Sequence, residues 1–306
     1  MIVVGIDIGG TKSLAVRMNG AEVVEESRVE LDRSLSALDA IARSVDSVLN
    51  DEVGAVGVGI AGLVRQGDGT FLWGPHVLGS NLQIRTEMSD RFGMPVHVDN
   101  DANTAAIAEL RLGAARGHSD ALFVSLGTGI GGAVIINGSL YRGGSFAGEW
   151  GHVQVDRDGL LCDCGKRGCW ETLASGPALV RLAREVVSVN PDSSIARLLG
   201  SSRITGEAVV AAADAGDEIA RALVTDVGRS FGQGLANLVA IFDPEIIIVG
   251  GGLGSVGESI VGPARRVLID AVYGGKVRVP PTVRVAELGP AAGAIGAALQ
   301  AAGEVR

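Results

Sequence analysis

The sequence has no apolar run long enough to cross a membrane and no excess of positive charge. None of its hydrophobic stretches reaches 18 residues, and the N-terminus lacks a basic region ahead of an apolar core. We therefore expect no membrane association and a cytoplasmic protein. Lys and Arg number 26 against 35 Asp and Glu, for a net charge of −9. A nucleic-acid surface requires clustered Lys and Arg, so we expect no nucleic-acid partner.

Cysteine is also scarce, and the few cysteines are concentrated. All three, Cys162, Cys164 and Cys169, lie within eight residues, and His152 stands ten residues before the first. Three cysteines cannot all pair with one another, and disulfides are rare in a cytoplasmic protein. A set of three thiols and one imidazole on glycine-rich turns suits tetrahedral structural zinc. We predict that these four residues bind Zn²⁺; free thiols are the alternative.

Glycine is abundant, with 46 residues in 306, where about 7% is typical of proteins. The first glycine cluster follows an apolar strand that begins at Ile2 and carries Asp7 at its end. Alternation resumes at Ser13, so Gly9 and Gly10 form a hairpin tip and do not open the helix that a P-loop needs. The backbone N–H groups of the tip, with Thr11 and Lys12 beside them, suit a phosphate. Asp7 could hold a metal ion through water; a plain β-turn is the alternative for the glycines.

A similar pattern begins again at residue 121. The predicted strand Ala121–Leu126 is followed by Gly127-Thr128-Gly129-Ile130-Gly131-Gly132 and a second strand at 133–136. The glycines match the dinucleotide fingerprint G-x-G-x-x-G, but that motif must open a helix, and here a β-branched run follows. We predict a second phosphate-binding hairpin and an internal repeat of two similar halves.

A third glycine cluster, 250–254, follows the predicted buried strand 245–249. Gly252, Gly254 and Gly257 match the dinucleotide fingerprint before a predicted helix at 256–272, which leaves an NAD-dependent oxidoreductase open. Only about 50 residues remain after it, too few for the strands of a dinucleotide half-fold. We favour an adenosine lying against the backbone of Gly251 and Gly252.

The most polar turn of the chain separates a predicted strand at 94–98 from a predicted helix at 102–115. Asp99, Asn100, Asp101 and Asn103 crowd this turn. Helix capping accounts for one such residue. A carboxylate held at a helix N-terminus could instead be aimed at a substrate hydroxyl, and we favour this function for the group.

The remaining periodicity predicts two α/β domains. Before the polar turn we expect a three-stranded meander, a helix at 35–49, a strand at 53–60, a loop at 63–82 and a helix at 84–92. After the cysteines we expect helices at 177–189, 206–213 and 217–241, a strand at 282–286 and a helix at 291–302. The first domain should span residues 1–118, completed by a C-terminal helix at 291–303. The second domain, with the zinc loop, should span 119–290.

Together these segments resemble the ROK (repressor, open reading frame, kinase) family, and within it the bacterial glucokinases. The resemblance covers nearly the whole chain. It rests on a set of motifs: Asp7-Ile8-Gly9-Gly10-Thr11-Lys12, Asn100-Asp101-Ala102-Asn103, Leu126-Gly127-Thr128-Gly129-Ile130-Gly131-Gly132, Glu149-x-Gly151-His152, Cys162-x-Cys164-Gly165-x-x-Gly168-Cys169-x-Glu171 and Val249-Gly250-Gly251-Gly252. The cysteine block with its trailing glutamate is the most specific of these.

The resemblance implies an actin-like ATPase fold, α/β in class, whose two domains flank a cleft for ATP and sugar. It implies that Asp101 is the general base for phosphorylation of the 6-hydroxyl of a hexose. Gly62, Asn100, Glu149, His152 and Glu171 would then bind the sugar, with His152 also on zinc. ATP would bind at Asp7, Gly9, Gly10, Thr11, Lys12, Gly127, Thr128, Gly129, Gly251 and Gly252, with Mg²⁺ near Asp7. We also expect a homo-oligomer, a dimer or tetramer.

The identity of the sugar is less determined than the reaction. Family glucokinases often carry Asn-Leu-Pro-Gly-Trp near the sugar, whereas this chain has Asn81-Leu82-Gln83-Ile84-Arg85. Glucose is favoured, and N-acetylmannosamine, N-acetylglucosamine and fructose remain alternatives, as does a non-catalytic sugar-binding regulator. Polyphosphate or ADP as phosphate donor is also open. Family repressors carry an additional helix-turn-helix; we expect none ahead of the first strand.

Overall fold

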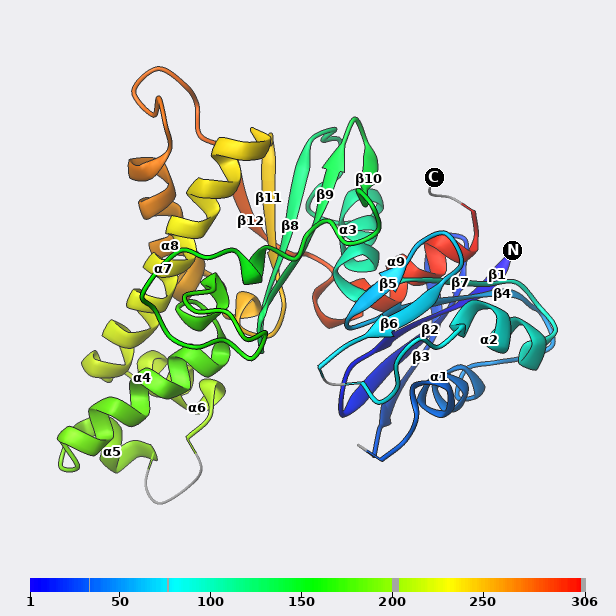
Figure 1. Ribbon diagram of the computed structural model, residues 1–306, viewed down its shortest axis with the longest axis horizontal. Helices are drawn as coiled ribbons and strands as arrows, with labels where there is room; N and C mark the ends of the chain where they lie inside the picture. Colours follow the sequence, from blue (N-terminus) through cyan, green and yellow to red (C-terminus); the bar gives the residue numbers. More distant parts are fainter. Residues whose placement is uncertain (33, 76, 200–203, 304–306) are drawn as a thin grey trace. The chain divides into compact units, whose positions relative to one another are not determined.

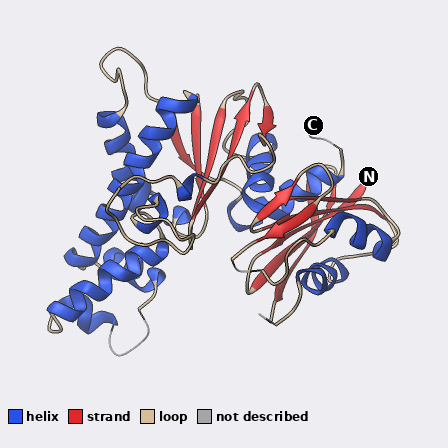
Figure 2. Ribbon diagram, in the orientation of Figure 1, coloured by secondary structure: helices blue, strands red, loops and turns tan. Residues whose placement is uncertain are grey.

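The computed structural model describes residues 1–32, 34–75, 77–199 and 204–303. Its contacts divide the chain into two compact units (Figures 1 and 2). Unit 1 comprises Met1–Phe123, Gly132–Gly148 and Glu287–Arg306, and unit 2 comprises Val124–Gly131 and Glu149–Ala286. Unit 1 therefore includes residues 132–148, which lie beyond the boundary at residue 118 that we expected from the sequence. No helix in these described ranges is long and apolar enough to cross a membrane.

Unit 1 is built on a five-stranded sheet of order β3-β2-β1-β4-β7. The first three strands are an antiparallel meander, and β4 and β7 extend it in parallel with β1. The strands are β1 (Ile2–Ile8), β2 (Lys12–Asn19), β3 (Glu22–Glu30), β4 (Val53–Ile60) and β7 (Val96–Asn100). The helices are α1 (Ala37–Asp46), α2 (Ile84–Phe92), α3 (Asp101–Arg111) and α9 (Ala292–Ala301).

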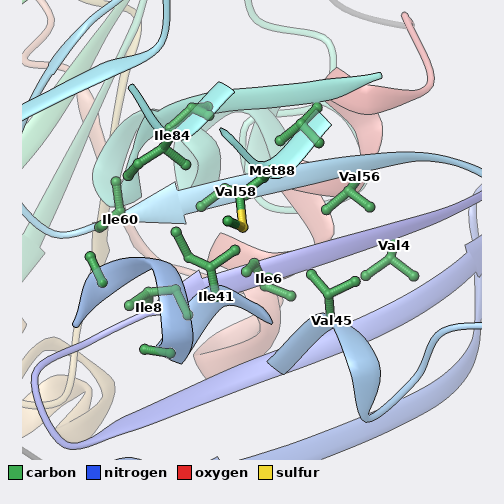
Figure 3. Packing of buried hydrophobic residues seen from close by; sticks show 14 of the residues in the cluster. Val4, Ile6, Ile8, Ile41, Val45, Val56, Val58, Ile60, Ile84 and Met88 are labelled. Carbon is green, nitrogen blue, oxygen red and sulfur yellow. The ribbon is translucent and has the colours of Figure 1, made fainter. Parts of the chain in front are cut away.

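Side chains alternate along β1 and so define two faces of this sheet. Val4, Ile6 and Ile8 are buried in a core that includes Ile41 and Val45 of α1 (Figure 3). Ile84 and Met88 of α2 complete this core beside β4. Helix α1 begins where the Ser36 hydroxyl accepts from the N–H of Asp39, and α2 ends at Gly93, whose φ of 67° favours glycine.

The opposite face of β1 and β4 carries few large side chains, and α9 packs directly on it. A Cβ added to Gly5 would be 2.0 Å from the carbonyl oxygen of Ala294, and one on Gly57 would be 1.9 Å from that of Ala297. These glycines therefore allow the α9 backbone to contact the sheet. On the same face of β1, two residues after Gly5, lies Asp7, next to Gly293 in the first turn of α9.

A second five-stranded sheet has the order β10-β9-β8-β11-β12. It repeats the order of the first sheet: third, second, first, fourth and fifth strand. The internal repeat predicted from the glycine hairpins is therefore present in the topology. The strands are β8 (Ala121–Leu126), β9 (Ile130–Ile136), β10 (Ser139–Tyr141), β11 (Ile246–Gly250) and β12 (Thr282–Val285). The division into units passes through β8 and β9.

Unit 2 carries most of the helical mass. Helix α7 packs along α8, and Gly228 and Gly232 allow close approach, since a Cβ on Gly232 would be 2.3 Å from the carbonyl oxygen of Ala264. The helices are α4 (Gly176–Val189), α5 (Ser194–Leu199), α6 (Gly206–Asp214), α7 (Glu218–Phe242) and α8 (Glu258–Ala271). Short 3₁₀ turns are η1 (Trp150–His152), η2 (Trp170–Thr172), η3 (Gly254–Val256) and η4 (Gly289–Ala291).

Most predicted elements are confirmed, and the loop predicted at 63–82 is wrong. Its described residues contain an antiparallel hairpin of β5 (Leu63–Arg65) and β6 (Thr70–Trp73). The turn is held by Asp68, whose carboxylate accepts from the Arg65 guanidinium and the N–H of Thr70. Strands of three and four residues are too short to show a period of two, so the sequence pattern did not distinguish them from a loop.

Candidate functional site

The polar residues at the end of β7 have three different roles. Asn100 caps α3, Asp99 belongs to a buried hydrogen-bond network, and Asp101 is the remaining carboxylate. The Asn100 side-chain oxygen caps α3 by accepting from the N–H groups of Ala102 at 2.8 Å and Asn103 at 3.2 Å. Its Nδ2 donates to the carbonyl of Gly62 at 3.1 Å. Asp101 is the first residue of α3 and is half-buried. Capping is thus the role of Asn100, which leaves the carboxylate of Asp101 available for chemistry.

Asp99 is buried and receives five hydrogen bonds. Its Oδ1 accepts from the N–H of Asn100 and from Nδ2 of Asn103, both at 2.8 Å. Its Oδ2 accepts from Nε of Arg142 at 2.9 Å, from Nη2 of Arg142 at 2.7 Å and from Nε2 of Gln300 at 2.7 Å. The charge of this carboxylate is therefore fully compensated within unit 1.

The carboxyl groups of Asp7 and Asp101 both have a raised pKa. Burial raises the pKa of Asp7 to about 8, and the negative charge of Asp101 contributes to the rise. Burial also raises the pKa of Asp101, although the N–H of Ala102 and the Asn100 side chain partly oppose this. A buried carboxyl group with a second carboxylate near it is a favourable environment for a cation or a transferable proton.

Gly62 lies where β4 leads into the β5–β6 hairpin, with a φ of 139°. A Cβ there would be 2.5 Å from the carbonyl oxygen of Trp73, so glycine is needed for the close packing. Asn81, also at positive φ, and Leu82 extend this hairpin, because Leu82 exchanges two backbone hydrogen bonds with Phe71. The segment that departs from the family pattern is therefore attached to the hairpin beside Gly62.

The predicted phosphate-binding tip of unit 1 connects β1 to β2. The N–H of Gly9 donates to the carbonyl of Lys12 at 3.1 Å. Thr11 and Lys12 are exposed, and Gly9 and Gly10 are partly exposed. The hairpin predicted from the sequence is confirmed, and its polar side chains face solvent, where a phosphate could reach them.

In unit 2 the other two glycine clusters come together. The N–H of Gly176, at the start of α4, donates to the carbonyl of Gly127 at 2.8 Å. A Cβ on Gly251, whose φ is 81°, would be 2.5 Å from the carbonyl oxygen of Leu126. These contacts bring the β8–β9 hairpin, the end of β11 and the N-terminus of α4 to one place.

A pocket of about 600 Å³ opens at this junction. Its walls combine glycine backbone, apolar side chains of α4, α6 and η3, and two arginines. The lining includes Gly127, Thr128, Gly176, Val180, Arg181, Arg184, Thr205, Glu207, Val210, Gly252, Leu253 and Val256. A volume of this size accommodates a nucleoside with phosphates. The 3₁₀ turn η3 occupies the middle of the G-x-G-x-x-G match at 252–257, and Gly257 is both the end of η3 and the N-cap of α8. Gly252, Leu253 and Val256 of this match line the pocket.

The predicted metal ligands form a compact group. One ligand atom each from His152, Cys162, Cys164 and Cys169 lie within 4.8 Å of one another. Sγ of Cys164 is 3.5 Å from Sγ of Cys169, and Sγ of Cys162 is 3.7 Å from Nδ1 of His152. Tetrahedral zinc with bonds of about 2.3 Å separates its ligand atoms by about 3.7 Å. The three thiols are unpaired, and the group fits this metal in chemistry and in size.

Glu171 lies against this group. Its Oε1 is 3.3 Å from Nδ1 of His152 and accepts from the thiol of Cys162 at 3.0 Å. Its Oε2 faces the β8–β9 tip, since a Cβ on Gly129 would be 2.6 Å away. Glu171 therefore lies between the group of His152 and the cysteines and the β8–β9 hairpin.

Two tryptophans fix the positions of these polar residues. Trp150, next to Glu149, donates from Nε1 to the carbonyl of Gly131 at 3.1 Å. Trp170, next to Glu171, stacks on Phe231 with a centroid distance of 5.4 Å and donates to the carbonyl of Ser230. These anchors were not predicted, because adjacency to a charged residue does not reveal which buried surface an indole will contact. Arg142 and the pocket arginines were not predicted either.

Each unit thus gathers its own set of the predicted residues. Unit 1 holds Gly62, Asn100 and Asp101, with Asp7 and the β1–β2 tip. Unit 2 holds His152 and Glu171 on the cysteine group, and Glu149 directly before η1. It also holds Gly127, Thr128 and Gly252 in the pocket wall, with Gly129 and Gly251 next to them in the chain.

Two sheets of the same strand order, each with a glycine hairpin between its first two strands, define an actin-like ATPase fold. The family is shown by similarity: the family model "ROK family" matches residues 3–304. The chain belongs to the ROK family.

Among its relatives is a glucokinase of Streptomyces coelicolor, 37% identical over 97% of this chain and 96% of the relative. The crystal structure of a ROK family glucokinase from Streptomyces griseus in complex with glucose and AMPPNP matches with a TM-score of 0.90 and 38% identity. It covers 99% of this chain and 100% of that chain. A xylose repressor of Caldicellulosiruptor bescii is 30% identical over 87% of this chain and 69% of the repressor. The family and fold expected from the motifs are confirmed.

We predict one tightly bound zinc ion per chain and its loss in Cys164→Ser. Because structural zinc stabilises the fold that holds it, this variant should melt at least about 5 °C lower. Elemental analysis of the purified protein and thermal unfolding measure the two effects. Asp163→Ser, an exposed change on the same turn, is the matched control and should keep zinc. Wild-type protein without zinc and with three freely titrating thiols would contradict the prediction.

The raised pKa of Asp7 predicts a pH-dependent gain in stability for Asp7→Asn. Between the ordinary pKa near 4 and the folded value of about 8, the folded state binds more protons than the unfolded state. Wild-type stability therefore falls as pH rises through this range, whereas the amide has no such dependence. We compare the free energy of unfolding of the variant with that of wild type at each pH. This difference should be at least about 1 kcal/mol more favourable to the variant at pH 8.5 than at pH 5.5.

Thermal unfolding at the two pH values, without added Mg²⁺, checks this prediction. Asp226→Asn, an exposed aspartate on α7, should show the same difference from wild type at both values. A pH-independent effect of Asp7→Asn would refute the prediction.

Proposed function

We propose that the protein is an ATP-dependent hexose kinase that phosphorylates glucose at the 6-hydroxyl, with Asp101 as general base. The position of Asp101 carries this proposal. It is a half-buried carboxylate with a raised pKa, at the start of a helix whose capping is already performed by Asn100. A general base works best when its pKa lies nearer to the working pH than that of an exposed carboxylate. The glucokinases among the relatives support the same reaction.

Phosphoryl transfer needs positioning and charge stabilisation more than covalent chemistry from the protein. Asp101 accepts the proton of the 6-hydroxyl as that oxygen bonds to the γ-phosphorus of ATP. The bond from the γ-phosphorus to the β–γ bridging oxygen breaks, and ADP leaves. General-base assistance contributes about 10²–10⁴-fold to the rate.

ATP is proposed to bind with its adenosine in the pocket of unit 2. The pocket wall formed by Gly127, Thr128 and Gly252 and by residues of α4 and α6 supports this placement, and Gly129 and Gly251 are proposed to lie along the same nucleotide. Gly9, Gly10, Thr11 and Lys12 of the β1–β2 tip are proposed phosphate ligands. Mg²⁺ would supply positive charge that stabilises the phosphates in the transition state. Asp7 would hold it, because Mg²⁺ prefers oxygen ligands and this carboxylate has the acidic neighbour Asp101.

Glucose is the proposed sugar because the candidate ligands are mostly hydrogen-bond acceptors. Asn100, Glu149, His152 and Glu171, with the backbone at Gly62, would meet its hydroxyl groups. A carboxylate accepts hydrogen bonds from hydroxyls and offers no donor to an acetamide carbonyl. This favours glucose over the N-acetylated hexosamines. His152 can face zinc with Nδ1, the atom nearest Cys162, and sugar with Nε2.

A non-catalytic, sugar-responsive regulator is the second candidate, and the similarity to a xylose repressor favours it. Such a protein would bind sugar without releasing ADP. Coupled detection of ADP during incubation with glucose and ATP distinguishes the two candidates.

The proposal extends to assembly and location. Exposed apolar side chains gather where α7 and α8 end: Ile241, Ile269, Tyr273, Val277 and Val279. The guanidinium of Arg278 contacts Asp243 and so ties this segment to the end of α7. Such a surface supports self-association into a dimer or tetramer. Unpaired thiols suit the reducing cytoplasm, where ATP is also available.

Asp101→Asn should bind glucose and AMPPNP but turn over at least about 10²-fold more slowly, because it keeps the shape and removes the base. Steady-state kinetics and calorimetric titration measure the two effects. In wild type, kcat/KM should fall as the pH decreases through the raised pKa of Asp101, at higher pH than for an exposed aspartate. Asp226→Asn is the matched control. Wild-type turnover by Asp101→Asn would overturn the assignment.

Glu171→Gln should raise the KM for glucose about 10- to 100-fold and change the KM for ATP little. The amide NH₂ cannot accept the hydrogen bond that the carboxylate accepts, and an unmatched buried partner costs about 1–3 kcal/mol. Zinc content is measured in parallel, because Glu171 also contacts Cys162. Glu22→Gln on exposed β3 is the control. Greater kcat/KM for N-acetylmannosamine or fructose than for glucose would refute the choice of sugar and leave Asp101 as base.

A further inference from the structure

The Asp99 carboxylate contacts the chain on both sides of Asp101. Its Oδ1 accepts from the N–H of Asn100, one residue before Asp101, and from the Asn103 side chain, two residues after it. An aspartate side chain has only two rotatable bonds, so the backbone at residue 101 largely decides where its carboxylate lies. A group that fixes residues 100 and 103 therefore also fixes the proposed base.

The Asn103 amide gives independent support for this dependence. Asn103 is 2% exposed, and its Oδ1 has no hydrogen-bond partner among the described residues. The bond from Nδ2 to Asp99 is therefore what orients this buried side chain. Buried polar atoms usually have a hydrogen-bond partner, and Oδ1 of Asn103 has none in the described part of the chain. The position of this side chain in the first turn of α3 therefore satisfies Asp99 and leaves its own oxygen unsatisfied.

Asp99 is itself held in one orientation by donors from distant segments. Oδ2 accepts from two N–H groups of Arg142, which follows β10, and from the Gln300 amide in the last turn of α9. The side chains of Asp99 and Arg142 are 7% and 12% exposed. Water therefore competes little for these bonds, and the carboxylate cannot rotate without breaking several of them.

We propose that Arg142 is a positioning residue for Asp101, acting through the Asp99 carboxylate, with Gln300 as its assistant. The inference rests on the proposed function, because it takes Asp101 as the base of a kinase. A misplacement of a catalytic group by about 1 Å can cost on the order of 10²-fold in rate. Loss of the second guanidinium donor should therefore reduce kcat more than it reduces binding.

The test is Arg142→Lys, which keeps the positive charge but replaces two directed donors by one ammonium group. We expect kcat to fall at least about 10-fold, with the KM values for glucose and ATP within about two-fold of wild type. Because the charge is retained, the acid limb of the pH–rate profile should stay in place. A lower kcat with an unmoved limb indicates a misplaced base and not an altered one.

Arg265→Lys is the matched control. Arg265 donates from Nη1 and Nη2 to Glu258 on α8, and Nη2 also donates to the carbonyl of Val283. Arg265→Lys also replaces two guanidinium donors to a carboxylate by one ammonium group, but in α8 of unit 2 and not beside α3. Its kcat should therefore remain within about two-fold of wild type. Melting temperatures of both variants identify any loss of folded protein.

Gln300→Met provides a second test if Arg142→Lys does not fold. It removes one donor to Oδ2 at similar volume and should lower kcat about three- to ten-fold with unchanged KM. Wild-type kcat in a folded Arg142→Lys, or in Gln300→Met if only that variant folds, would overturn the inference. A loss that appears in KM instead of kcat, or equally in Arg265→Lys, would also overturn it.

Failure of the proposed function gives a different result. An inactive wild type with zinc bound, or an active Asp101→Asn, refutes the kinase assignment and with it the inference. An active wild type, an inactive Asp101→Asn and a fully active Arg142→Lys refute only the role of Arg142.

Discussion

One carboxylate, that of Asp99, joins four segments that are far apart in the sequence of unit 1. It contacts the end of β7, the first turn of α3, the residue after β10 and the last turn of α9. A buried charge is tolerated only where donors surround it. The five donors are supplied only when α9 lies on the sheet and β10 lies beside α3. The polar turn that carries Asp101 is thus tied to the correct assembly of the whole unit.

This arrangement is possible because the face of the sheet that packs against α9 presents glycines and few large side chains. Gly5 and Gly57 allow α9 to contact β1 and β4 directly, and a Cβ on Gly296 would be 1.7 Å from the carbonyl oxygen of Thr104 in α3. Close packing of α9 brings Gln300 to Asp99 and Gly293 to Asp7. The same packing covers Asp7, and burial raises the pKa of this carboxylate. The glycines at this contact, the tight packing of α9 and the raised pKa of Asp7 therefore have one physical origin.

Unit 2 also holds its candidate polar residues in fixed positions, but by contacts of a different kind. Its polar residues lie in two 3₁₀ turns and a cysteine-rich loop, which are held by backbone hydrogen bonds such as that from the N–H of Trp170 to the carbonyl of Val153. Trp150 and Trp170 anchor these turns to β9 and α7, and the side chains of His152 and the three cysteines lie close together between them. Glu171 is held between that group and the β8–β9 hairpin. A loop stabilised in this way can present a carboxylate with little freedom to move.

The sequence alone determined the elements and most of the candidate residues. Period-two and period-3.6 patterns located strands such as Val53–Ile60 and helices such as Ile84–Phe92, and the motif spacings indicated the family, the hairpin tips and the metal ligands, because these signals are local. The tertiary structure decided what depends on distant partners: the β5–β6 hairpin, the division of the polar turn between Asn100, Asp99 and Asp101, and the pairing of Asp99 with Arg142. Residues 43 positions apart meet only when the sheet and α3 are assembled, and no local pattern in the chain encodes that distance.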